Sequence, residues 1–65
     1  MSVEELKAEV KRLNVRATQA KMDLHDLSEN LPQGWENILA IAQRAYDAFA
    51  HLTAQRAALK QTEDG

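Results

Sequence analysis

The residues with the clearest capacity for chemistry lie in one short stretch, where a thioether, an imidazole and two carboxylates recur at helical spacing. His25 and Glu29 are four residues apart, as are Met22 and Asp26, so on a helix all four lie on one face. Imidazole and carboxylate groups at this spacing can hold a divalent transition metal. One chain supplies only two or three ligands, so a tight site would require ligands from another copy. The alternative interpretation of these residues is an ordinary solvated helix face.

Other chemistry finds little support in the sequence. The chain has no cysteine, which excludes disulfides, thiolate zinc sites and thiol catalysis. It has no glycine-rich phosphate loop and no nucleophile beside a histidine, and a narrow helical bundle has no room for a substrate pocket. We therefore expect no catalytic residues, and a protein that is not an enzyme and has no cofactor other than such a metal.

Two apolar repeats define the elements that must position these residues. The first runs from Val3 to Leu31 at alternating intervals of three and four residues. The second runs from Trp35 to Leu59 at the same intervals, with Arg56 as its one polar member. This heptad spacing is typical of helices packed as a coiled coil.

The break between the repeats, residues 30–34, contains the only proline and one of the two glycines. A short connection between helices of nearly equal length predicts an antiparallel pair. The expected fold is all-α, a two-helix hairpin over about 2–31 and 35–61. We expect residues 1–65 to form a single domain, with residues 62–65 as a frayed tail.

The hairpin register pairs Leu13 with Leu52 and Ala17 with Phe49, but it sets Ala20 against Ala45 and so leaves a gap between small side chains. The second helix also has an apolar face that is too broad for one narrow partner. We therefore expect a homodimer that forms an antiparallel four-helix bundle, with a tetramer left open. Its core is expected to contain Ala17, Ala20, Leu24, Leu39, Ile41, Ala45, Tyr46 and Phe49.

The outer surface offers three features for a partner protein. Val15 and Met22 are apolar residues on the solvent side of the first helix. Asp23 and Asp26 belong to an acidic end, since no lysine or arginine occurs between residues 22 and 43. We expect Trp35 to close the core end beside the loop, with an exposed anchor for a partner as the alternative.

The stretch 17–27, followed by Leu31-Pro32 and Trp35-Glu36, resembles the Rop-like family of small proteins. The resemblance runs from about Glu5 to Lys60 and implies a self-associating helical hairpin. Members are encoded in nitrogen-fixation gene clusters, often beside the cofactor carrier NifX, which implies a role accessory to nitrogenase. The family's molecular activity is not established, so the resemblance assigns no catalytic residues.

Charge and hydropathy argue against nucleic acids and membranes as binding partners. The net charge of −2 argues against sequence-independent binding of nucleic acid. No apolar run approaches the ~18 residues of a membrane span, and no export signal is visible, so we expect a cytoplasmic protein. The resulting hypothesis is a non-enzymatic accessory protein that binds nitrogenase or a cofactor-assembly protein. The alternatives are a metal-binding protein and, less favoured, an RNA-binding regulator.

Overall fold

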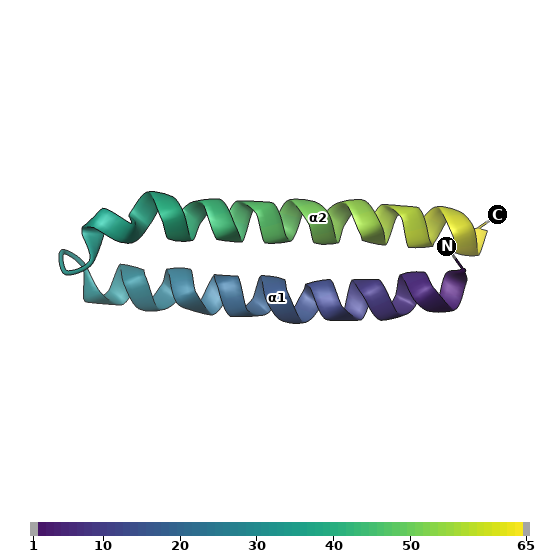
Figure 1. Ribbon diagram of the computed structural model, residues 1–65, viewed down its shortest axis with the longest axis horizontal. Helices are drawn as coiled ribbons and strands as arrows, with labels where there is room; N and C mark the ends of the chain where they lie inside the picture. The colour runs from purple at the N-terminus through teal and green to yellow at the C-terminus, as the bar shows by residue number, and fades with distance from the viewer. Residues whose placement is uncertain (1, 65) are drawn as a thin grey trace.

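The chain forms two long antiparallel helices that lie side by side, with both ends of the chain at one end of the rod (Figure 1). The computed structural model describes residues 2–64. Helix α1 spans Val3–Asn30, a short 3-10 helix η1 spans Trp35–Asn37, and α2 spans Ile38–Asp64. The rod measures 49 × 15 × 14 Å. The all-helical hairpin is therefore confirmed, and no strand occurs among the described residues.

Helix α1 has a side-chain cap at its start and a proline after its end. The Ser2 hydroxyl oxygen accepts the Glu5 backbone N–H at 3.1 Å, and the hydroxyl donates to Glu5 Oε1 at 3.3 Å. This satisfies one of the helix's free amide donors. At the other end, Leu31 leaves helical geometry with ψ of 143° because Pro32 follows it. The expected bounds of 2–31 thus hold to within one residue at each end.

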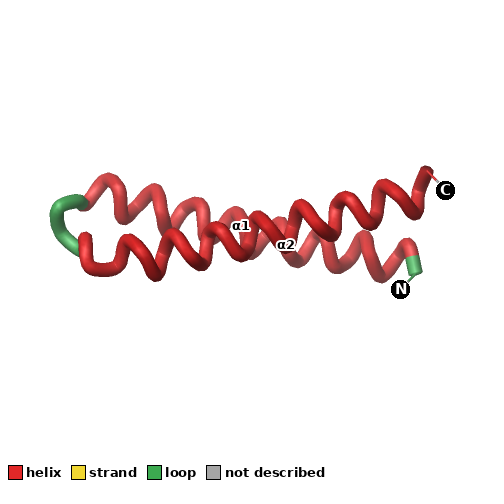
Figure 2. The backbone as a smooth tube through the Cα atoms, turned by 90° about the horizontal axis from the view of Figure 1, so that it is seen from above, coloured by secondary structure: helices red, strands yellow, loops and turns green. Residues whose placement is uncertain are grey.

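The connection is a compact turn (Figure 2), and it contains a cis peptide bond between Leu31 and Pro32. The backbone N–H of Gln33 donates to the Asn30 carbonyl at 3.0 Å. Gly34 has φ of 80°, a left-handed conformation that glycine adopts at little cost. The Gly34 carbonyl then accepts the Asn37 N–H at 2.9 Å, which starts η1.

Helix α2 starts later and ends later than the predicted range of about 35–61. It begins at Ile38, after η1, and continues to Asp64, although residues 62–65 were expected to be a frayed tail. The Thr62 hydroxyl donates to the Ala58 carbonyl at 2.9 Å, so it bonds back along the helix. Gly65 lies outside the described residues.

The core is a narrow seam along the two helices. Its buried residues are Leu6, Leu13, Ala17, Ala45 and Leu52. Leu13, Ala17 and Leu52 form one cluster, which confirms the predicted pairing of Leu13 with Leu52. Neither helix, within the described residues, is long and apolar enough to cross a membrane.

Phe49 and Arg56 are two of the predicted seam positions that are exposed in the structure. Phe49 was expected to pack on Ala17, but it is 42% exposed, and Ala48 packs against the cluster instead. Because an α-helix turns by about 100° per residue, Ala48 and Phe49 fall on opposite sides of the buried Ala45. Arg56 is exposed, and its guanidinium donates to Asn14 Oδ1 on α1 at 3.2 Å.

Candidate protein-interaction surfaces

One side of α2 presents large apolar side chains to solvent. We call Ile38, Leu39, Tyr46 and Phe49 the apolar face, because all four fall on the same side of Ala45 at 100° per residue. Leu39 is 84% exposed and Tyr46 is 72% exposed. Leu24 on α1 is also exposed. Several large apolar side chains exposed on one side of a helix mark a contact with another molecule more often than scattered ones do.

The residues predicted for the core of a dimer do not form one surface. Ala17 and Ala45 are buried within the hairpin itself, since the two helices alone cover these small side chains. The exposed members are Leu24, Leu39, Tyr46 and Phe49. Ala20 and Ile41 are half-buried and line a groove on the other side of the seam.

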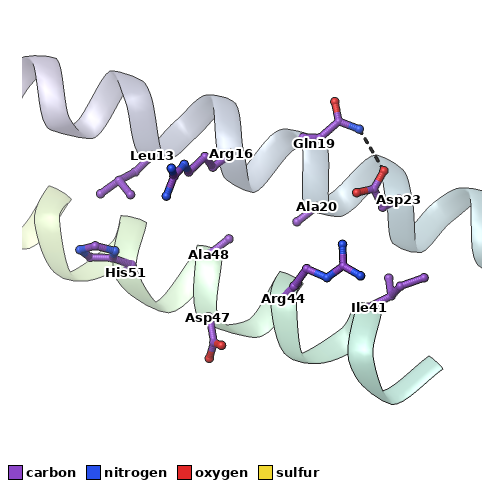
Figure 3. A pocket seen from close by; sticks show the side chains of 10 residues that line it. All are labelled: Leu13, Arg16, Gln19, Ala20, Asp23, Ile41, Arg44, Asp47, Ala48 and His51. Carbon is purple, nitrogen blue, oxygen red and sulfur yellow. Dashed lines mark hydrogen bonds between the residues drawn. The ribbon is translucent and has the colours of Figure 1, made fainter. Parts of the chain in front are cut away.

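This central groove has a volume of 430 Å³ and lies between the middle sections of α1 and α2 (Figure 3). Its apolar lining comes from Leu13, Ala20, Ile41 and Ala48. Its polar lining comes from Arg16, Gln19, Asp23, Arg44, Asp47 and His51. Ala20 and Ala48 carry only methyl groups, so the side chains at these two positions fill little of the groove. Ala20 therefore lines open space, but Ala45, its predicted partner, is buried and does not line the groove, so this groove is not the predicted gap between Ala20 and Ala45.

The aspartates of the central groove accept hydrogen bonds from neighbouring side chains, whereas its arginines do not form hydrogen bonds with described residues. Asp23 Oδ1 accepts from the Gln19 amide at 2.9 Å, and Asp47 Oδ1 accepts from the Gln43 amide at 2.8 Å. Both carboxylates therefore have a neighbour on their own helix. Neither Arg16 nor Arg44 forms a hydrogen bond or an ion pair with any described residue.

Glu9 lies on α1 toward the start of the chain, and its carboxylate has a lowered pKa. The hydrogen bonds from Arg12 to both carboxylate oxygens are the largest cause, and they lower the pKa of Glu9 below its ordinary value. Desolvation by burial opposes this effect and raises the pKa, while the charges of Arg12, His51 and Arg16 lower it further. The positive charges of Arg16 and His51, which line the central groove, therefore act on the Glu9 carboxylate.

The predicted metal ligands are only partly brought together. His25 Nε2 lies 3.3 Å from Glu29 Oε1, as expected for residues four apart, while His25 Nδ1 lies 3.9 Å from Asp26 Oδ1. Met22 is exposed on the same helix. Within the described part of the chain, no three His, Asp or Glu side chains are grouped so that they could hold a metal ion. A tight site would still need ligands from another copy.

The predicted partner-binding residues lie on different parts of the molecule. Val15 and Met22 are exposed on α1, and Asp23 lines the central groove. Asp26 lines a smaller hollow toward the loop. Trp35 was expected to close the core end, but it is 62% exposed, so this expectation is wrong. Trp35 starts η1 instead of continuing α2, which takes its side chain out of the helical register.

Sequence reasoning did not identify Arg16, Arg44 and His51 as site residues. They lie outside the apolar repeats, and at 3.6 residues per turn many exposed charges flank any seam. The signal that could have found them was the small side chain of Ala20 in the apolar repeat, because Ala20 lines the groove beside these residues.

The fold and these surfaces define a small helical-hairpin protein whose exposed faces suit contacts with other chains. A Rop-like family profile matches residues 1–64, and the chain belongs to this family. It is 49% identical to a UPF0437 protein of Azorhizobium caulinodans over 63 residues, which cover 97% of this chain and 91% of that protein. A Frankia alni relative, described as a UPF0437 protein in the nifX-nifW intergenic region, is 51% identical over 43 residues, or 66% of this chain and 52% of that one.

Two solved structures have the same fold. A structural-genomics target determined by NMR is 45% identical, with a TM-score of 0.91 and coverage of 100% of this chain and 92% of that one. A crystal structure of a DUF683-family protein from the cyanobacterium Cyanothece 51142 is 42% identical, with a TM-score of 0.89 and coverage of 91% and 97%. The hairpin is therefore the common architecture of these relatives.

Proposed function

We propose that this chain is a non-enzymatic accessory protein of nitrogen fixation that acts by binding a protein partner in nitrogenase assembly or regulation. The observation that carries the proposal is the exposure of large apolar side chains on one side of α2, which suits contacts with other chains. The link to nitrogen fixation is supported by the Frankia alni relative, whose description places it between nifX and nifW.

A homodimer is part of this proposal. Leu39 and Tyr46 are seven residues apart, so they lie on one stripe of α2, and Ile38 and Phe49 flank that stripe on the seam side. Burying this apolar face against a second copy would remove its area from water and complete an antiparallel four-helix bundle. The partner protein would then contact the surfaces that the dimer leaves exposed.

The genetic test is deletion of the gene in its nitrogen-fixing host, with growth compared on dinitrogen and on ammonium. We expect slower growth on dinitrogen alone, which the wild-type gene restores. Normal growth of the deletion strain on dinitrogen, with unchanged nitrogenase activity, would contradict the proposed role.

The biochemical test is chemical cross-linking in the same host with a tagged copy of the protein. We expect cross-links to a nitrogenase subunit or to a cofactor-assembly protein. A tagged Leu39→Lys/Tyr46→Lys copy tests whether the cross-links depend on the homodimer. This variant changes the apolar face and leaves α1 and the central groove unchanged. Cross-links to ribosomal or other abundant proteins alone would count against the proposal.

A further inference from the structure

The central groove has the character of a docking site that the hairpin leaves unfilled. Its floor is apolar, formed by Leu13, Ala20, Ile41 and Ala48. Its volume of 430 Å³ is in the range of sites that hold a bulky apolar side chain or more. While this floor is in contact with water, it lacks the van der Waals contacts that a side chain of another molecule could make with both helices.

The charges around the floor indicate what would fill it. Arg16 comes from α1 and Arg44 from α2, so guanidinium groups approach the groove from both helices (Figure 3). In this view Arg44 reaches toward Ala20 and Asp23 of α1, whereas the Asp47 carboxylate points away from α1. Neither arginine has a hydrogen bond or ion pair with a described residue. Arginine is well suited to bind carboxylates through two parallel hydrogen bonds.

The acidic residues beside the groove favour a protein segment over a nucleic acid as its occupant. Asp23 lines the groove next to Arg44, and Glu9 lies close enough to Arg16 and His51 for their charges to lower its pKa. A run of phosphates would be repelled by these carboxylates, while isolated carboxylates on a peptide can be placed on the arginines alone. Because carboxylates and guanidinium groups alternate around the groove, it suits a peptide better than RNA as a ligand.

We propose that the central groove binds an acidic amphipathic helix of a partner protein, with an apolar side chain over Ala20 and Ala48 and carboxylates on Arg16 and Arg44. Such a segment would lie along the two helices as a third helix does in a bundle. This inference rests on the proposed function, because it names the chemistry of the partner that the proposed function requires.

The groove stays accessible when the apolar face pairs with a second copy. On α2, Ile41, Arg44 and Ala48 fall on one side of Ala45, and the apolar face falls on the other. One hairpin can therefore use one side for the homodimer and the other for the partner segment. The two contacts are separable by mutation.

The test is a titration of the isotopically labelled protein with a synthetic helical peptide of about 14 residues that carries one leucine between glutamates on a single face. Backbone amide chemical shifts locate the binding site. We expect shifts at Ala20, Ile41 and Ala48, and none at Leu39 or Tyr46. A peptide with lysine in place of each glutamate is the matched probe, and it should bind at least about tenfold more weakly.

The double substitution Arg16→Glu/Arg44→Glu should weaken acidic-peptide binding by about tenfold or more. Lys11→Glu/Lys60→Glu is the matched control, since it makes the same charge change at exposed lysines outside the groove and should leave affinity within about twofold. If reversal lowers the helix content measured by circular dichroism, Arg16→Gln/Arg44→Gln replaces it, with a smaller loss expected.

Several outcomes would overturn the inference. These are no shift at the groove, equal affinity for the lysine peptide, equal loss in the control variant, or preferential binding of a stem-loop RNA at the same residues. The proposed function fails separately. Normal growth on dinitrogen after gene deletion would refute that role and leave acidic-peptide binding intact, while absent peptide binding would leave the growth defect standing.

Discussion

Leu13 and Val15 show how two residues on one helix differ in their importance for folding. Leu13 is 2% exposed in the central cluster, and Val15 is 66% exposed on the solvent side of α1. Leu13→Ala should lower the free energy of unfolding by about 2–4 kcal/mol, because it removes packed atoms from a thin core. Urea unfolding followed by circular dichroism at one fixed chain concentration measures the change.

Val15→Ala is the matched control for that experiment. It removes apolar atoms that are already in contact with water, so the free energy of unfolding should stay within about 0.5 kcal/mol of wild type. Equal losses for the two variants would mean that the Val15 side of α1 is also buried in the protein in solution.

Glu9 and Arg12 predict a local pH dependence. Because Arg12 hydrogen bonds lower the pKa of Glu9, the ionised carboxylate favours the folded state. This contribution is present above the ordinary pKa of glutamate and is lost as pH falls through the lowered pKa of the folded protein. Arg12→Gln should raise the pKa of Glu9 toward its ordinary value, as measured by NMR titration of the side-chain carboxyl carbon.

Lys11→Gln is the control for the Glu9 titration. It removes the same charge from the next position along α1, but Lys11 is not among the groups that shift Glu9. The pKa of Glu9 should stay lowered in this variant. An unshifted Glu9 in the wild-type protein would show that the Arg12 contact does not persist in solution.

At the scale of the elements, the loop depends on the left-handed backbone of Gly34. An added Cβ would lie 3.4 Å from Leu27 Cδ1, an ordinary contact, so the cost of substitution comes from φ of 80° rather than from crowding. Gly34→Ala should lower the free energy of unfolding by about 1–2 kcal/mol. Thermal unfolding followed by circular dichroism measures this cost.

Gly34→Asn is the informative companion variant, since asparagine adopts left-handed geometry more readily than alanine does. It should recover part of the stability lost in Gly34→Ala. Equal stability of the two variants would indicate that the turn changes conformation rather than bearing the strain.

The two helices and their register could be predicted from the sequence because the apolar repeat specifies which residues must meet. Leu13 opposite Leu52 followed directly from it. The repeat could not place Phe49 or Trp35, since a single position of rotation or a 3-10 turn moves a large side chain from seam to surface. The groove charges escaped prediction because exposed arginines carry no periodic signal until the small residues beside them are known.

At the scale of the whole molecule, the apolar face predicts the state of assembly. Wild-type protein should sediment at twice the mass of one chain at micromolar concentration, because burying Leu39 and Tyr46 removes apolar area from water. Leu39→Lys/Tyr46→Lys should shift the equilibrium to single chains, since lysines there would have to be desolvated in the interface. Sedimentation equilibrium measures both masses.

Val15→Lys/Met22→Lys is the control for assembly, because it adds the same charge to exposed apolar residues of α1. It should leave the mass of a dimer unchanged. If this variant dissociates and the Leu39/Tyr46 variant does not, the copies meet through α1 instead.

The exposed position of Trp35 has a practical consequence for optical spectroscopy. It is the single tryptophan of the chain and lies at the loop end of a rod 49 Å long. Its fluorescence therefore reports the polarity at one end only: emission should move to shorter wavelength when a molecule covers the loop, and should hold steady when a ligand occupies the middle of the rod.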